Sequence, residues 1–278
     1  MFYGVAWLDN GSSHGGSLTQ SYYGWDFILF CAICQLSQLC CGKRSGQLGI
    51  DFYDGATYHA LHISTQAKPM KYQSIPVTPF QQNCSIVWCE KTKQCAIIDP
   101  GGDIDKLSAV IEKEGLTPVA IWLTHGHLDH VGGTVTLAER YELPIIGPHE
   151  GDAFWLDGLP QQSEMFGFPH HDAFRPTRWL KAGETLTLGE ESFEVRFTPG
   201  HTPGHVVLFN ESAHIVFVGD VLFSGSIGRT DFPGGNHQHL MDAIKTQLWP
   251  MPDDTVVVSG HGPNTTIGHE RKTNPNVR

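Results

Sequence analysis

From residue 70 onward, the spacing of apolar residues switches repeatedly between the period of a strand and that of a helix. Short β-type runs predict strands over 72–77, 85–88, 95–98, 119–123, 144–146, 185–188, 193–198, 206–210, 214–218 and 255–259. Helical spacing predicts helices after Asp103, which we expect to act as an N-cap, and over 134–141 and 239–248. Residues 150–180 show neither period and are predicted to be irregular. Strands interleaved with helices indicate an α/β fold of two sheets with helices outside, although the spacing alone also allows other α/β layouts.

The first 69 residues differ in composition from the rest of the chain. They contain no Glu and five of the seven tyrosines. An apolar run at 27–34 lacks the basic flank of a secretory signal, because Asp26 precedes it and no Lys or Arg occurs before Lys43. We therefore expect two parts. Residues 1–69 form an extension that is disordered or that results from a start codon placed too early, and residues 70–278 form the folded domain.

The segment 124–130 (THGHLDH) directly follows the apolar run 119–123 and carries three imidazoles and one carboxylate. Such a run reads as a buried strand that places its loop at the edge of a sheet. Imidazole is the commonest protein ligand for zinc, and Asp adds an oxygen donor. Four donors at this spacing cannot all bind one tetrahedral ion without strain, but they can serve two adjacent ions.

Three further donors follow predicted strands and have glycine neighbours. They are His201, Asp220 and His261. Glycine lets the backbone turn sharply at the end of a strand, which brings side chains from different loops together. The four loops therefore predict one assembled site.

In order and approximate spacing, these residues resemble the ligand motif of the metallo-β-lactamase-fold hydrolases, and the resemblance covers residues 70–278. It implies a four-layer αββα sandwich with a two-metal site at one edge of the sheets. The implied ligands are His125, His127 and His201 for the first ion, Asp129, His130 and His261 for the second, and Asp220 as the bridge. Asp99 would orient a ligand histidine. The resemblance implies two divalent metal ions. Zn²⁺ is the first choice for both, although such ligands also accept iron or manganese.

Within this family the chain is most similar to glyoxalase II, the hydroxyacylglutathione hydrolases, in their short bacterial form. The similar stretches are 70–72, 82–84, 98–102, 225–235 and 260–263. The resemblance implies hydrolysis of S-D-lactoylglutathione or related thioesters to glutathione and D-lactate, by attack of a metal-bound hydroxide that Asp129 helps to orient. The longer glyoxalase II enzymes hold glutathione with a C-terminal helical domain, which we do not expect here, so the glutathione-binding residues stay undefined.

Other branches of the family fit less well. Antibiotic-hydrolysing forms commonly carry Cys in place of Asp220, and diiron flavoproteins carry an acid in place of His127. The main rival is a persulfide dioxygenase with one iron on His125, His201 and Asp220, although Gly262 stands where that branch has an Asp. A lactone or ester hydrolase, and a metal-binding protein with incidental catalysis, also stay open.

Composition limits the partners. A formal net charge of −11 argues against nucleic acid and anionic membranes, and no apolar run reaches the roughly 18–20 residues of a membrane span. The seven cysteines do not suggest a secreted disulfide framework, and the pair Cys31 and Cys34 lacks a second pair for a zinc ribbon. We expect a cytoplasmic enzyme with a small glutathione thioester as substrate and leave the oligomeric state open.

Two further features have two readings each, and a third has one. The aromatic residues of 154–168 together with Trp179 form either a lid over the site or an edge cluster over the core. Arg229 either contacts an anionic substrate or pairs within its own loop. His205 shares the turn of His201 and is expected beside the site.

Overall fold

The computed structural model describes residues 70–277, so the expectations for residues 1–69 lie outside the described part. The larger strands are β1 (Lys71–Val77), β2 (Gln82–Trp88), β3 (Gln94–Ile98), β4 (Thr117–Trp122), β6 (Thr185–Leu188), β7 (Glu191–Phe197), β8 (Val206–Asn210), β9 (Ile215–Gly219) and β12 (Val256–Ser259). Two-residue strands are β5 (Ile145–Ile146), β10 (Leu222–Phe223), β11 (Ser226–Ile227) and β13 (Thr265–Thr266). The helices are α2 (Ile104–Lys113), α3 (Leu128–Val131), α4 (Thr134–Tyr141), α5 (Ala153–Asp157), α6 (Leu159–Phe166), α7 (His237–Ala243) with the π-helical continuation η3 (Ile244–Leu248), and α8 (Ile267–Thr273).

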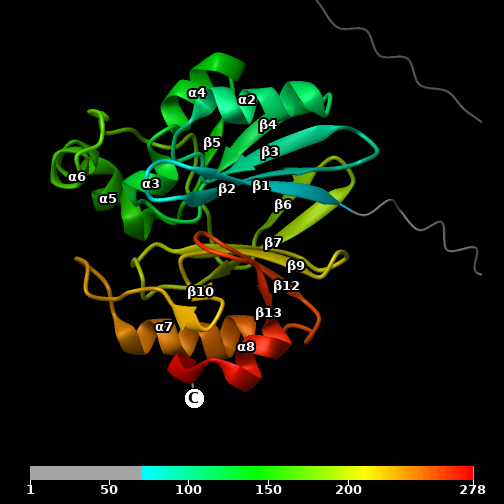
Figure 1. Cartoon of the computed structure of the whole chain (residues 1–278), viewed down its shortest axis with the longest axis vertical. Coiled ribbons are helices and arrows are strands. Elements are labelled where there is room, and N and C mark those ends of the chain that lie inside the picture. Colours follow the sequence, from blue (N-terminus) through cyan, green and yellow to red (C-terminus); the bar gives the residue numbers. More distant parts are fainter. Residues whose placement is uncertain (1–69, 278) are drawn as a thin grey trace, which may run out of the picture. The chain divides into compact units, whose positions relative to one another are not determined.

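Apart from β10 and β11, which pair only with each other, the strands form two mixed sheets with helices outside each. The first sheet has the order β1-β2-β3-β4-β5, and the second has the order β13-β12-β9-β8-β7-β6. Figure 1 shows α2 and α4 along the outer side of the first sheet and α7 and α8 along the outer side of the second. The predicted αββα sandwich is therefore confirmed.

Neighbouring residues of one strand pack into different apolar layers, because successive side chains of a strand point to opposite faces. Ile86 packs in the outer layer of the first sheet, together with Leu107 of α2, whereas Val87 packs between the sheets. In the second sheet Phe217 faces the layer between the sheets and Val216 faces the layer under α7. Burial on both faces explains why these strands are continuous apolar runs rather than alternating ones.

The prediction that residues 150–180 are irregular is wrong over part of that range. The segment contains α5 and α6, which are separated by Gly158. Both helices are short, and α6 buries only Leu159, Gln162 and Ser163, so no apolar period long enough to identify a helix occurs in the sequence. The helix α8 after His261 was also not predicted.

Asp103 occupies the expected N-cap position of α2 but does not cap it with its side chain. Its backbone is left-handed, at φ 51°, and no side-chain cap hydrogen bond forms. The carboxylate instead accepts the N–H of Thr78 at 3.1 Å and pairs with Lys106 at 2.8 Å. Asp103 therefore fastens the turn between β1 and β2 to the start of α2.

All the predicted site residues come directly or shortly after the carboxyl end of a strand. Asp99 follows β3 and the segment 124–130 follows β4, in the first sheet. His201, Asp220 and His261 follow β7, β9 and β12, in the second sheet. Backbone hydrogen bonds join the residues after β4 and β12 to the first residues of strands in the other sheet, from Val206 N in β8 to Thr124 O at 2.9 Å and from Asn83 N in β2 to Gly260 O at 2.7 Å. The fold thus brings both sets of loops to one edge.

Among residues 70–277, none of the helices has the length and apolar character needed to cross a bilayer.

Candidate metal centre

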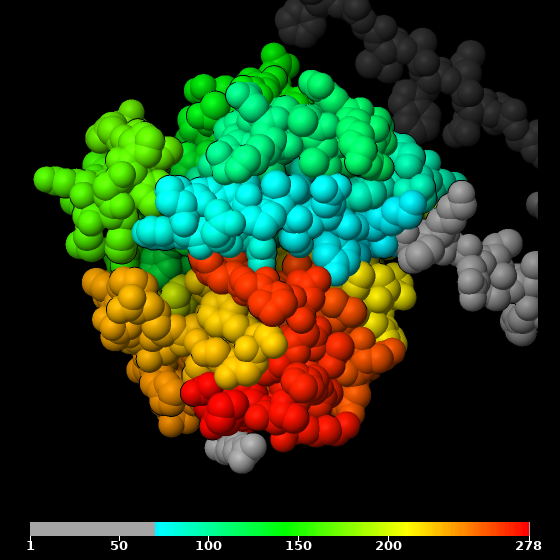
Figure 2. All heavy atoms as spheres, in the orientation of Figure 1, coloured from blue at the N-terminus to red at the C-terminus, as the bar shows by residue number. Residues whose placement is uncertain are grey.

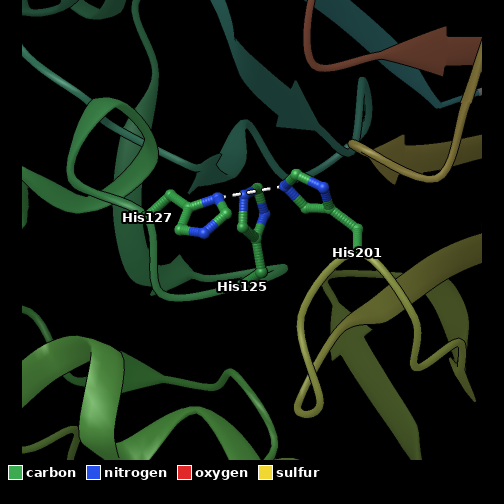
Figure 3. A group of neighbouring side chains, drawn as sticks. All are labelled: His125, His127 and His201. Atoms are coloured by element: carbon green, nitrogen blue, oxygen red, sulfur yellow. Dashed lines mark hydrogen bonds between the residues drawn. The ribbon is translucent and has the colours of Figure 1, made fainter. Parts of the chain in front are cut away.

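Three histidines from two loops converge at this edge. The donor atoms of His125, His127 and His201 all lie within 4.8 Å of one another, and the three side chains are buried. Figure 3 shows the rings turned toward one another, with Nδ1 of His127 3.0 Å from Nε2 of His201. Nδ1 of His201 lies 2.7 Å from the carbonyl oxygen of Arg229 and donates to it, which leaves Nε2 with its lone pair facing the group.

A second group lies beside the first. It consists of Asp129, His130 and His261, whose donor atoms also lie within 4.8 Å of one another. Nε2 of His261 is 3.2 Å from Oδ2 of Asp129. This group is less enclosed than the histidine group, because Asp129 and His261 are partly exposed.

The carboxylate of Asp220 lies between the two groups. Oδ1 of Asp220 is 3.3 Å from Nε2 of His130, and Oδ2 is 3.6 Å from Nε2 of both His201 and His261. All seven residues that the sequence singled out are therefore brought together.

Four donor atoms of the centre are buried without hydrogen-bond partners. Those without a partner are Nε2 of His125, His127 and His130 and Oδ1 of Asp220. A buried polar atom without a partner is costly, so four of them in one cluster need a common explanation. Divalent cations bound by imidazole nitrogens and carboxylate oxygens satisfy such atoms directly, and the residues present fit two of them.

The charge states of the cluster also suit metal ions. Burial, followed by the neighbouring imidazoles, holds the pKa values of His125 and His127 well below their usual value, so both rings are neutral and able to bind a metal. Burial alone would lower the pKa of His130, but the carboxylates of Asp220 and Asp129 raise it well above the usual value. A proton on His130 therefore competes with a metal ion for the same nitrogen.

Asp99 supports the centre from behind. Its Oδ1 accepts the backbone N–H of Thr124 at 2.8 Å, and its Oδ2 accepts the hydroxyl of Thr124 at 2.6 Å and Nδ1–H of His130 at 2.9 Å. With both oxygens occupied, Asp99 orients His130, as expected, and leaves Nε2 of His130 directed at Asp220.

His205 lies beside the centre, as expected from its turn. Its Nε2 accepts the backbone N–H of Asp220 at 3.2 Å, and its ring stacks on His125 with the centroids 4.7 Å apart. Gly219 allows this contact, because a Cβ there would lie 2.8 Å from Nε2 of His205 and because its φ is +47°.

Two supporting residues were missed from the sequence. Gln82 is fully buried, its Nε2 lies 3.3 Å from Nδ1 of His130, and its backbone forms a β-bridge with His261. Asp152 is fully buried and accepts hydrogen bonds from Gly126, Thr202 and Gly204. Neither lies in a motif with metal-binding spacing, and only a buried position in the fold marks them.

A cavity of about 810 Å³ opens above the centre. Its floor contains five of the seven residues, namely His127, Asp129, His201, Asp220 and His261. In the aromatic segment, Phe154, Trp155 and Phe166 line the cavity, as expected for a lid. Phe168 and Trp179 instead pack on the apolar layer outside the first sheet, as expected for an edge cluster. Both readings are therefore correct for different residues.

Arg229 lines the cavity and also pairs within its own loop. Its Nε donates to Oδ1 of Asp231 at 2.7 Å, and its guanidinium lies 4.1 Å above the ring of Phe232.

Comparison with known families gives one match that spans most of the described residues. The model described as "Metallo-beta-lactamase superfamily" matches residues 77–261. This range contains every residue of the centre.

The individual proteins that are similar to this chain have different names. The hydroxyacylglutathione hydrolase GloC of Haemophilus influenzae is 47% identical over 207 residues, covering 74% of this chain and 97% of that protein. The structure of the BLEG-1 B3 metallo-beta-lactamase is 39% identical, with a TM-score of 0.70, and the match covers 74% of this chain and 99% of that one. The structure of TTHA1623 in a di-iron-bound form is 37% identical, with a TM-score of 0.67, and the match covers 73% of this chain and 98% of that one.

Proposed function

The chain belongs to the metallo-beta-lactamase superfamily, and from that premise we propose that it hydrolyses the thioester of S-D-lactoylglutathione or related hydroxyacylglutathiones. The products are glutathione and a hydroxy acid, D-lactate for the lactoyl substrate. The 47% identity to a hydroxyacylglutathione hydrolase supports this substrate class.

We assign the metal ligands as the sequence predicted them. His125, His127 and His201 hold one ion, Asp129, His130 and His261 hold the other, and Asp220 lies between the two. The observation that carries the proposal is the convergence of four buried, unpartnered donor atoms beside a cavity of about 810 Å³, which His127 and Asp220 line. Zinc is our first assignment because neutral imidazoles and carboxylates suit it. A di-iron relative makes iron the alternative.

When bound, two divalent ions lower the pKa of a water molecule from about 15.7 towards 7 and polarise a carbonyl group. Asp129 is partly exposed on the cavity floor, where its carboxylate can accept a hydrogen bond from the attacking water and orient it. The water oxygen bonds to the carbonyl carbon, the C–S bond breaks, and the leaving thiolate takes the proton that the water releases. A thiol with a pKa of about 8.5 leaves as the thiolate without much help from an acid.

Aromatic side chains restrict the access of other water molecules to the floor. The ring centroids of Trp155 and Phe232 lie 4.4 Å and 5.1 Å from that of His127, and both rings meet it edge to face, at 83° and 67°. A substrate that enters therefore meets the centre in an environment from which bulk water is partly excluded.

The test is the loss of thioester absorbance of S-D-lactoylglutathione, with metal-loaded protein beside a metal-depleted sample. Metal-dependent hydrolysis supports the proposal. A metal-loaded protein that leaves the thioester intact contradicts it and directs attention to persulfide oxidation or to lactone and ester hydrolysis. Metal analysis separates these outcomes, because the dioxygenase alternative needs one iron per chain whereas the hydrolase needs two ions.

A further inference from the structure

We propose that the cavity selects its thioester by a bulky apolar acyl group and binds the thiol half only weakly. The inference rests on the proposed thioester hydrolysis and adds the kind of substrate that the cavity fits best.

The exposed apolar side chains of the domain gather at this cavity. Among residues 70–277, five large hydrophobic residues are exposed, namely Phe80, Val135, Phe154, Met165 and Phe166. Four of the five line the cavity, and only Val135 of α4 does not. Apolar surface concentrated at one opening marks a site for an apolar ligand.

The segments that carry these side chains come from both halves of the fold. Figure 2 shows the chain around α6, in yellow-green, above the chain that leads into α7, in orange, at one edge of the molecule. Phe154, Met165 and Phe166 come from α5 and α6, whereas Phe232 precedes α7. The opening therefore has apolar walls on two sides.

The apolar walls continue from the opening down to the metal centre. At the opening, the rings of Phe80 and Phe166 meet edge to face with their centroids 5.8 Å apart. At the floor, Trp155 and Phe232 contact His127. The acyl substituent and the sulfur are both bonded to the carbonyl carbon, so both lie within a few ångströms of the floor when hydrolysis occurs. Of the two halves, glutathione carries the charged groups, which apolar rings do not favour, so we assign the contact with these rings to the acyl group.

The cavity has little to offer the charged groups of glutathione, which carries two carboxylates and an ammonium. Among the described lining residues Arg229 is the only lysine or arginine, and its guanidinium is already engaged by Asp231 and by the ring of Phe232. A lactoyl group, in turn, presents a single methyl group to a cavity of about 810 Å³. A larger apolar substituent would fill more of that space and would gain the corresponding burial energy.

The experiment compares two acyl groups on two thiols, with the full-length, metal-loaded protein. Lactoyl and mandeloyl groups both carry the 2-hydroxyl and differ only in a methyl against a phenyl substituent. The thiols are glutathione and N-acetylcysteamine, which is uncharged. We expect mandeloylglutathione to exceed lactoylglutathione by about tenfold or more in kcat/KM, the scale on which apolar pockets discriminate. Replacing glutathione by N-acetylcysteamine should lower kcat/KM by less than about tenfold.

Two variants with equal exposure separate cavity effects from general surface effects. Phe166 and Val135 are each 38% exposed, and only Phe166 lines the cavity. Phe166→Ser should lower the ratio of mandeloyl to lactoyl kcat/KM by about threefold to tenfold, the loss expected for removing one apolar contact. Val135→Ser should leave that ratio unchanged.

The outcomes distinguish this inference from the proposed function. If lactoylglutathione is hydrolysed but mandeloylglutathione is no better, or if the charged thiol is required, the selection by an apolar acyl group is refuted and the thioesterase function stands. If neither thioester is hydrolysed on either thiol, the proposed function itself fails, and this inference with it.

Discussion

Oδ1 of Asp152 accepts the backbone N–H of Gly204 at 2.5 Å. Oδ2 of the same carboxylate accepts the N–H of Gly126 at 2.9 Å and the hydroxyl of Thr202 at 2.7 Å. One buried side chain therefore joins the loop that carries His125 and His127 to the loop that carries His201. Its carboxylate makes these hydrogen bonds to the loops themselves and not to the three rings.

The contacts of Asp152 predict a pH dependence of stability in the metal-free protein. Burial raises the pKa of its carboxyl to about 6, although the three donors oppose this, whereas the usual value is 3.8. The folded state thus favours the protonated form, and ionisation costs stability as the pH rises from about 4 to about 6. Compared with Asp152→Asn, whose side chain does not titrate, the wild type should lose unfolding free energy across this range and lose no more above it. Chemical denaturation of both proteins at several pH values measures this, and a constant difference between them would refute it.

Replacing Asp99 should weaken metal binding without removing a ligand. Asp99→Asn loses the acceptor that holds Nδ1–H of His130, and changes of this kind cost about 10–100-fold in metal affinity. Competition with a chelator of known affinity measures the loss. Asp105→Asn, which removes an exposed surface carboxylate, is the control and should bind metal like the wild type.

Removing the carboxylate of Asp220, which lies between the two ligand groups, should weaken metal binding more than replacing Asp99 does. Asp220→Ala should lose bound metal and catalytic rate together, with metal affinity falling by more than about 100-fold, beyond the loss expected for a supporting residue. Metal analysis of the purified variant beside its thioester hydrolysis gives both readouts. Full metal content in the variant would show that Asp220 does not bridge the ions.

The domain boundary expected from the sequence also gives a prediction. We propose that residues 70–278 form the complete catalytic domain, since the family match and all residues of the centre lie within them. The fragment 70–278 should be soluble, bind two metal ions and keep the kcat/KM of the full chain. An insoluble or inactive fragment would show that residues 1–69 take part in folding or catalysis.

Most of the sandwich could be predicted because its strands are buried on both faces. The runs at 95–98 and 119–123 are apolar without interruption, and the structure places them at β3 and β4, in the middle of the first sheet. The short helices α5 and α6 could not be predicted. Their side chains are divided between the outer core and the cavity, so no single apolar face repeats along them.

The metal centre, too, could be predicted from the sequence only in part. Closely spaced donors in the segment 124–130, and glycine beside His201, Asp220 and His261, were visible in the sequence, and the structure brings these residues together. Gln82 and Asp152 could not be found in this way. Each acts on a loop far away in the chain, from Gln82 to His261 and from Asp152 to Gly204, and such pairs follow only from the folded arrangement of the two sheets.

The donors come from both sheets, and this has a consequence for folding. Four of them follow β4, and the other three follow β7, β9 and β12, so neither half of the domain holds a complete set for either ion. A nascent chain that ends before β7 lacks His201, Asp220 and His261, so it has a complete ligand set for neither ion. A chain that ends before β12 still lacks His261. With the ligands that we propose, bound metal would therefore act as a late cross-link between the two halves of the domain.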